Sequence, residues 1–472
     1  MQTSRKTKTV LVICPFPLAI RNLINSGLAS QIQRSLNATV AVVSPYPDEF
    51  FKSDQDTFKN FTVPSSGSIG GIPQLSEINL FEKALKSVHL TNFSIRYPDA
   101  SLQNMELSAR KGVSYFVAWI TEQLFPDNSK RRKLLSSVVQ KIAFSKPSIS
   151  SIFTKLNPIC IIVASPGHYW LDYHVIAESK KRSIPSICVI LSWDNLYSRG
   201  PLCRRPDFLF VWSEEMKKQA IQVHRFESNH ISIVGALQFR FYQDHPTQQQ
   251  IFGVKRKLGL DPCESYIAYV CGARTSEYDV EDIIVLKSVL AKSKYLDLKI
   301  IVRPHPQGNK AAYARLKDYG IIVDDQLDVL NGDPCVFDKH SMEYMAAFLS
   351  GSSFVISSWG TTALLEACIF QRPSIQLRWM DAVKHSNPTE VLMVKNFQRY
   401  IHMKAFDEEG GRLYSDHPST ISEIMDHLEK SKSHFETLRR MTVERIVHLP
   451  LGKVVERVVE AIDVQCLSRY NN

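Results

Sequence analysis

The sequence predicts an α/β fold made of two successive doubly wound, Rossmann-like halves. Short apolar runs alternate with helical patterns in both parts of the chain, which is typical of βα units around parallel sheets. The 472 residues, 44% of them hydrophobic, are enough for two domains that each bury a core. A polar stretch without periodicity, residues 239–250, lies between the two series and contains Pro246, so we expect the hinge there.

The first series predicts five strands, at residues 9–13, 39–44, 161–165, 186–191 and 208–213. Helices are expected after most of them, at 21–35, 173–182 and 214–223. The basic residues near the N-terminus and the apolar run that follows them also resemble a signal peptide. Pro15 and Pro17 interrupt that run and a helical pattern follows, which favours a first β-strand.

An insertion at about 50–150 separates the second and third predicted strands and is too long for an ordinary βα loop. We expect it to be largely helical. Its aromatic segment 114–125 precedes the basic run KRRK at 130–133. This helix either packs in a core or lies on the surface and meets anionic lipid head groups.

The second series begins with 231–235, which we interpret as a connector. Strands are then expected at 266–272, 299–304, 320–324, 354–358 and 374–377. The last segment opens with Pro418 and a possible capping pair, Thr420 and Glu423. It then has a helical pattern to about Ile462, with a break near Pro450.

Charge and cysteine content limit the partners and the compartment. The net charge of +10 favours an anionic partner, which leaves nucleic acid, nucleotide phosphates and a membrane surface open. Nine cysteines without a CxxC pair argue against a disulfide framework or a zinc site and favour a reducing, cytosolic setting. No apolar stretch approaches the ~20 residues of a membrane-spanning helix.

Polar residues follow the predicted strands of the second half, where an open parallel sheet binds its ligands. Gly272 and Arg274 follow one strand, and Arg303 and His305 end the next. The stretch SSWGTTALLEA at 357–367 places small and hydroxyl residues at a helix start, which suits phosphate. The candidates there are Ser357, Ser358, Gly360, Thr361 and Thr362, with Glu366 further into the helix as a ribose ligand. Each piece alone also fits a helix cap or a solvated carboxylate.

Four motifs together resemble the bacterial surface-carbohydrate glycosyltransferases of the GT-B fold: RPHP, SSWGTTALLEA, PFPLAIRNLINSG and IPSICVILSWDNLYSRG. That group is similar to teichoic acid glycerophosphotransferases, to capsule transferases with a His-Pro motif and to UDP-N-acetylglucosamine 2-epimerases. The resemblance covers most of the chain except the insertion. It implies an acceptor-side domain over 1–238, a nucleotide-sugar domain over 250–445, and a cleft between them. The closing helix, 446–472, would cross back to the first domain.

The chemistry expected of such a site needs cations at the donor phosphates and, for inversion, a general base. We expect Arg303 and His305 to be those cations, without metal or cofactor, since no DxD-like pair ends a strand of the second half. Candidates for the catalytic carboxylate or base are Asp194, His168, Asp172 and Glu277. Arg21 is a candidate for holding the acceptor or the donor phosphate. The motif FDEEGG at 406–411 resembles an acidic sialyltransferase motif but follows the His-Pro element instead of preceding it, so we discount it.

The expected function is transfer of a sugar from a nucleotide-sugar to a surface polysaccharide or lipid-linked glycan. A CDP-polyol phosphotransferase, a UDP-sugar 2-epimerase and a nucleotide- or polyanion-binding protein without turnover are the alternatives. We expect a cytoplasmic location with peripheral contact to an anionic membrane. Nucleic acid is not expected as a partner, because the basic residues that can be placed lie at strand ends and no nucleic-acid motif is present.

Overall fold

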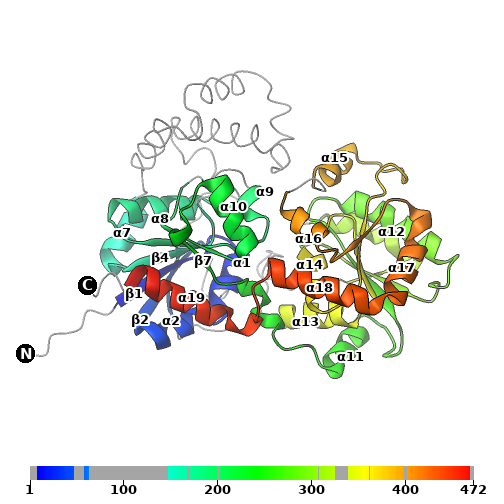
Figure 1. Ribbon diagram of the computed structural model, residues 1–472, viewed down its shortest axis with the longest axis horizontal. Helices are drawn as coiled ribbons and strands as arrows, with labels where there is room; N and C mark the ends of the chain where they lie inside the picture. Colours follow the sequence, from blue (N-terminus) through cyan, green and yellow to red (C-terminus); the bar gives the residue numbers. More distant parts are fainter. Residues whose placement is uncertain are drawn as a thin grey trace, which may run out of the picture. The chain divides into compact units, whose positions relative to one another are not determined.

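A computed structural model describes residues 8–46, 51, 58–62, 147–166, 169–198, 202, 204–306, 308–324, 339–360, 362–397 and 401–467. Contacts divide the chain into two compact units (Figure 1). Unit 1 is Met1–Arg240 with His448–Asn472, and unit 2 is Phe241–Val447. Each unit is a parallel sheet flanked by helices, which confirms the predicted α/β class. The predicted aromatic helix 114–125 and the KRRK run lie outside the described residues.

The sheet of unit 1 has seven parallel strands in the order β3-β2-β1-β4-β5-β6-β7. They are β1 (Lys8–Ile13), β2 (Ala38–Ser44), β3 (Phe58–Thr62), β4 (Cys160–Val163), β5 (Ser186–Val189), β6 (Phe208–Val211) and β7 (Ile231–Ile233). Two edge strands correct the sequence analysis. β3 lies in the range expected as a helical insertion and pairs with β2. β7, expected as a connector to the second half, pairs with β6 and forms an edge of the first sheet.

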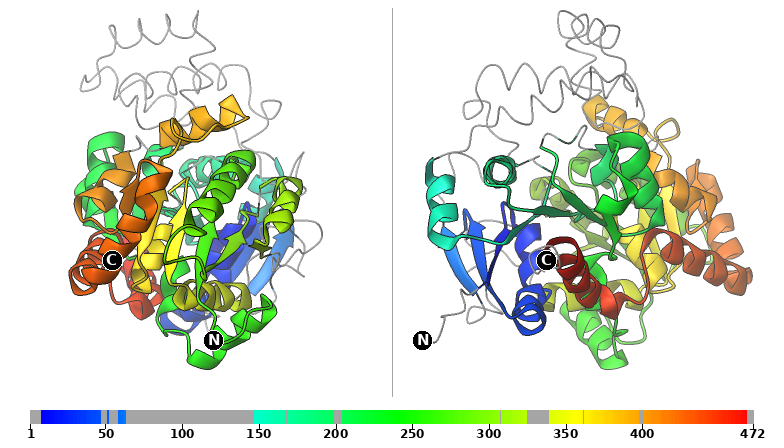
Figure 2. Two further views of the ribbon diagram at one scale, coloured as in Figure 1. Left: turned by 90° about the vertical axis from the view of Figure 1, so that its right-hand side faces the viewer. Right: turned by 60° about the vertical axis from the view of Figure 1, so that its left-hand side comes forward.

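Helices cover both faces of this sheet. α2 (Leu28–Leu36) and α19 (Val454–Ile462) pack together, and α7 (Pro147–Leu156) and α8 (Trp170–Lys181) pack together on the other face (Figure 2). Other helical segments among the described residues of this unit are α1 (Pro17–Ala19), η1 (Ile20–Ile24), α9 (Asn195–Ser198), α10 (Glu214–His224), η4 (Ser228–His230), η9 (Leu451–Lys453) and η10 (Asp463–Leu467).

The stretch expected as an irregular hinge is partly helical. η5 spans Leu237–Tyr242, and α11 (Gln248–Lys257) begins inside the stretch. Thr247 and Gln250 form a capping box at the start of α11, with the Gln250 backbone N–H donating to Thr247 Oγ1 and the Thr247 N–H donating to Gln250 Oε1. The T-x-x-Q spacing was the available signal for this helix start.

The sheet of unit 2 has six parallel strands in the order β10-β9-β8-β11-β12-β13. They are β8 (Tyr266–Val270), β9 (Lys299–Arg303), β10 (Ile322–Val323), β11 (Phe354–Ser357), β12 (Ser374–Leu377) and β13 (Leu413–Ser415). β13 was not predicted. It is a three-residue edge strand, too short to produce an apolar pattern of its own.

On one face of this sheet, α12 (Ser276–Leu290), η6 (Lys310–Tyr319) and α17 (Ile421–Lys430) contribute to one hydrophobic core. α13 (Lys339–Gly351) and α18 (Lys432–Ile446) both pack against α14 (Thr362–Ile369). The other helical segments are α15 (Pro388–Phe397), η7 (Ile401–Met403), α16 (Lys404–Glu408) and η8 (Pro418–Thr420). None of the described helices is long and apolar enough to cross a membrane.

The capping pair expected at Thr420 and Glu423 does not form. Thr420 precedes α17 but has helical angles, φ −88° and ψ −10°, because residues 418–420 already form a helical turn. Its hydroxyl donates to the His417 carbonyl at 2.8 Å instead of accepting from the next turn. The predicted helical segment is also broken at Ser431, between α17 and α18.

In both sheets the order in which successive strands are added reverses between two inner strands. These are β1 and β4 in unit 1 and β8 and β11 in unit 2. In open α/β sheets, ligands bind at the carboxyl ends of the strands at this switch point. The loops after β8, β9 and β11 in unit 2 are therefore where a ligand site is expected from topology. Those loops carry Gly272, His305 and Gly360.

Candidate active site

The loops after β8 and β11 are packed against each other through Gly272. A Cβ atom on Gly272 would lie 2.4 Å from Thr275 Oγ1 and 2.9 Å from Trp359 Cγ. Real Cβ atoms do not approach other atoms this closely, so the contact requires glycine. Gly272 was expected among the ligand-binding residues, and its close neighbour in the structure is the Trp359 side chain.

Asp279, on α12, holds the loop after β8 in place. Its Oδ2 accepts from the Gly272 backbone N–H at 3.0 Å and from Thr275 Oγ1 at 2.9 Å. Burial raises the pKa of this carboxyl well above its usual value, although the two donors act in the opposite direction. The Gly272 N–H is thus occupied by a protein group.

Asp282 lies one helical turn further along α12 and connects two more loops. Ser358 Oγ donates to Asp282 Oδ2 at 2.6 Å, and His385 Nε2 lies 3.0 Å from Asp282 Oδ1. The side chains of Asp282 and His385 are 0% and 1% exposed, and the His385 ring stacks on Tyr278 with centroids 3.7 Å apart. Two buried carboxylates therefore fix the loops that follow β8, β11 and β12.

The Tyr269 hydroxyl links the two carboxylates. It lies 2.5 Å from Ser358 Oγ and donates to Asp279 Oδ1 at 3.4 Å. Ser358, predicted as a phosphate ligand, is thus fully buried and bonded to protein groups. Its placement favours a role in shaping the turn. The sequence signal for this network was the pair of acids three residues apart, Asp279 and Asp282, each next to an apolar residue, Val280 and Ile283.

Arg303 and His305 do not form the pair of free cations that we expected. Arg303 Nη1 donates to Asp324 Oδ2 at 2.5 Å, and both side chains are buried, so a carboxylate offsets its charge. Burial lowers the pKa of His305 to about 4, so its imidazole is neutral at pH 7. His305 lies just past β9 and supplies a neutral hydrogen-bonding group at this edge of the sheet.

The turn after β11 leads into α14. Ser357 is fully buried, and its Oγ accepts from the Trp359 backbone N–H at 3.3 Å. Gly360 has φ +70°, in the left-handed region that favours glycine, and α14 begins at Thr362. Thr361 lies outside the described residues. A helix start after a glycine turn is suited to binding an anion.

Three other predicted residues of unit 2 lie on its helices or loops. Glu366 is partly exposed on α14, one turn after Thr362. Arg274 is exposed just before α12 and contacts no carboxylate among the residues that the structure describes. Glu277, in the first turn of α12, lies 3.4 Å from Arg315 Nη2 and is therefore paired.

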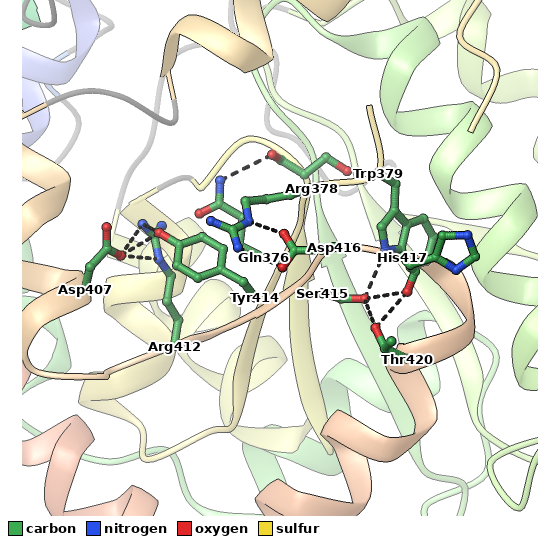
Figure 3. A network of polar contacts seen from close by, with 11 residues as sticks. Gln376, Arg378, Trp379, Asp407, Arg412, Tyr414, Ser415, Asp416, His417 and Thr420 are labelled. Carbon is green, nitrogen blue, oxygen red and sulfur yellow. Dashed lines mark hydrogen bonds and ion pairs between the residues drawn. The ribbon is translucent and has the colours of Figure 1, made fainter. Parts of the chain in front are cut away.

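A second polar network lies beside the turn and joins α16, β12 and the start of β13 (Figure 3). Asp407 Oδ1 accepts from Arg412 Nη2 at 2.8 Å and from the Tyr414 hydroxyl at 2.6 Å. Asp407 belongs to the FDEEGG motif that the sequence analysis discounted, and its partner Arg412 was not singled out. Gln376, on β12, is fully buried next to them.

In unit 1, the predicted residues occupy different environments. Arg21, on η1, is nearly buried and donates to Asn22 Oδ1 at 2.7 Å and to Gln238 Oε1 at 3.0 Å. Asp194, just past β5, is partly exposed and accepts from the Ser192 hydroxyl. His168 lies outside the described residues.

Asp172 is fully buried in the first turn of α8. It accepts from Ser165 Oγ at 2.5 Å, and burial raises the pKa of its carboxyl well above the usual value. The carboxylate is thus bonded to Ser165 in the interior of unit 1. The placement favours a role in holding the loop after β4 against α8 instead of the catalytic role considered for Asp172.

No protein-family model and no curated protein sequence matches this chain. Solved structures do. A glycosyltransferase from Rickettsia africae is 10% identical with a TM-score of 0.50 over 97% of this chain and 98% of its own. The Neisseria meningitidis UDP-GlcNAc 2-epimerase bound to UDP-GlcNAc is 13% identical, with a TM-score of 0.51 over 96% and 99%.

A putative UDP-N-acetylglucosamine 2-epimerase from Listeria monocytogenes is 12% identical, with a TM-score of 0.53 over 97% of this chain and 96% of that one. Identities this low establish the fold alone. The sequence motifs pointed to the same group of structures. The chain therefore has the GT-B fold of two Rossmann-like domains.

Proposed function

We propose that this protein is a glycosyltransferase that transfers a sugar from a nucleotide-sugar to a surface polysaccharide or a lipid-linked glycan. The observation that carries the proposal is the switch point of the second sheet. There, the loops of Gly272 and Trp359 are in contact, and the left-handed turn at Gly360 leads into a helix start. The Neisseria structure, with UDP-GlcNAc bound, supports a nucleotide-sugar as the ligand of this fold.

The donor phosphates would bind at the start of α14, where helix N–H groups and the helix dipole favour negative charge. Glu366, one turn into α14, would accept from the ribose hydroxyls. As the bond between sugar and phosphate breaks, negative charge grows on the departing phosphate. Fixed donors at that position stabilise the transition state more than the bound donor.

His305 and Arg274 would complete the donor site in different ways. A neutral His305 donates a hydrogen bond to the leaving phosphate and adds no positive charge at pH 7. Arg274 is the exposed cation of the loop after β8 and would bind the phosphates by charge. This division of roles replaces the two-cation arrangement expected from the sequence.

Unit 1 would supply the acceptor side. Asp194 is the preferred general base, because it lies past the carboxyl end of β5 and keeps exposed surface. Glu277 is a weaker candidate, since Arg315 already pairs with it. The net charge of +10 suits an anionic glycan or a lipid-linked acceptor at a membrane surface.

The test is incubation of the purified chain with UDP-, GDP- and CMP-sugars and with CDP-glycerol, followed by NMR. We expect one class of nucleotide-sugar to release its nucleotide slowly in the absence of acceptor, with water taking the sugar. Asp194→Asn should still bind that donor but transfer no sugar to an acceptor. Conversion of UDP-GlcNAc to its 2-epimer would identify an epimerase, and turnover of CDP-glycerol alone a polyol phosphotransferase. Failure to bind any of the four contradicts the proposal.

A further inference from the structure

We infer that Arg412 is a further ligand of the donor phosphates and donates from Nη1 to a phosphate oxygen beside the Gly360 turn. This inference rests on the proposed function. It adds to the donor site a residue that directly precedes the edge strand β13. Three features of unit 2 support it: an unsatisfied guanidinium N–H, its position relative to Gly360, and a neighbouring arginine that is paired at the surface.

Arg412 is held firmly on one side of its guanidinium. Nε and Nη2 donate to Asp407 Oδ1 at 3.2 and 2.8 Å, and Nη2 also lies 2.6 Å from the Tyr414 hydroxyl. The Arg412 side chain is 1% exposed. Its Nη1 is buried and has no hydrogen-bond partner among the described residues. Leaving a buried donor unsatisfied is unfavourable, and more so when the group is charged.

This unsatisfied Nη1 lies against the turn that precedes α14. A Cβ atom built on Gly360 would be 2.9 Å from Arg412 Nη1 and 2.9 Å from both Nε2 and Oε1 of Gln376. Gln376 Oε1 is likewise buried without a partner in the described part of the chain. Two polar groups with unused hydrogen-bonding capacity therefore lie beside Gly360, in the turn that precedes α14.

The electrostatics point to an anion at this turn. The start of an α-helix carries partial positive charge, and a guanidinium beside it adds a full one, so each makes the other less favourable without an anion. Asp407 offsets the charge of the guanidinium, as Asp324 does for Arg303, but it contacts only Nε and Nη2, so the Nη1 donor stays unsatisfied. A phosphate oxygen accepting from Nη1 would satisfy this donor in a charge-assisted hydrogen bond, and the phosphate's negative charge would be favourable at the helix start.

Arg378 provides a matched comparison from the adjacent strand end. Its guanidinium also lies on the Tyr414 ring, 3.9 Å from the centroid, against 4.9 Å for Arg412 (Figure 3). Arg378 Nε and Nη2 donate to Asp416 at 2.6 and 2.9 Å, and the Asp416 side chain is 68% exposed. Arg378 thus has the same ring contact as Arg412, but its guanidinium pairs with an exposed carboxylate at the surface.

The experiment is calorimetric titration of the full chain with pyrophosphate, with UDP, GDP and CDP, and with the three corresponding nucleosides. For Arg412→Gln we expect the Kd of phosphate-bearing ligands to rise by about 10- to 100-fold, as for loss of a charge-assisted hydrogen bond. Nucleoside affinity should change by less than about twofold. Arg378→Gln should bind every ligand as the wild type does.

A second variant, Arg412→Gln with Asp407→Asn, removes both charges and avoids leaving Asp407 unpaired. It should show the same selective loss. Equal losses for nucleosides and diphosphates, or no loss for diphosphates, would overturn the inference while the function stands. If the wild-type chain binds no phosphate-bearing ligand, the inference and the proposed function both fail, and the wild-type titration alone identifies that outcome.

Discussion

Gly360→Ala should lower the affinity for phosphate-bearing ligands by at least about tenfold and destabilise the turn after β11. Two costs combine. The left-handed backbone, φ +70°, is unfavourable for alanine by about 1–2 kcal/mol. The new methyl group would also lie 2.9 Å from Arg412 Nη1 and from the Gln376 amide, so one of these buried side chains must move.

Gly259→Ala is the matched control for this substitution. Gly259 has φ +74°, but a Cβ there has no neighbour within 4 Å. The substitution should therefore lower the free energy of unfolding by about 1–2 kcal/mol through the left-handed backbone, and it should leave ligand affinity unchanged. Calorimetric titration with UDP, GDP and CDP measures the affinity. If the two substitutions changed ligand affinity equally, the residues around Gly360 would have no specific role in ligand binding.

Asp282→Ala should lower the free energy of opening of the second sheet by about 2–6 kcal/mol, because two buried groups lose their acceptor and each unsatisfied buried group costs about 1–3 kcal/mol. Ser358 Oγ and His385 Nε2 would both lose their acceptor in a region without water access. Hydrogen–deuterium exchange of β8 and β11 peptides measures this opening. The effect should also appear as weaker nucleotide binding, because Ser358 precedes the turn.

Lys432→Ala is the control for an ordinary ion pair. Lys432 lies 3.9 Å from Glu436 with its side chain 77% exposed, and such pairs contribute about 0–1 kcal/mol. Asp282→Asn should recover part of the stability, since an amide oxygen can still accept from one partner. An Asp282→Ala chain that exchanges as slowly as Lys432→Ala would refute the structural role of the buried carboxylates.

The fold was predictable where burial imposes a long apolar run. β8, β9 and β11 lie inside their sheet, so the stretches around Ile267, Ile300 and Val355 stand out in the sequence. The missed strands, β3, β7 and β13, are all edge strands with partly exposed residues. An edge strand pairs on one side only and needs less apolar surface, so its sequence carries a weaker signal.

The candidate site was predictable in position but not in its interactions. Parallel topology alone places the residues after β8, β9 and β11 at one edge. The partners, however, are far apart in the chain: Arg303 pairs with Asp324, 21 residues away, and Ser358 with Asp282, 76 residues away. No local pattern encodes these pairs. Burial sets the neutral state of His305, which sequence spacing does not report.

The most direct test of the donor site is hydrogen–deuterium exchange of the wild-type chain with and without the best-binding nucleotide among UDP, GDP and CDP. Bound nucleotide should slow exchange in the peptides that carry Gly272, His305 and Gly360, and it should change exchange little on β10, at the far edge of the same sheet. If exchange slowed in none of the three peptides while the nucleotide is bound, that result would contradict a donor site at this edge of the sheet.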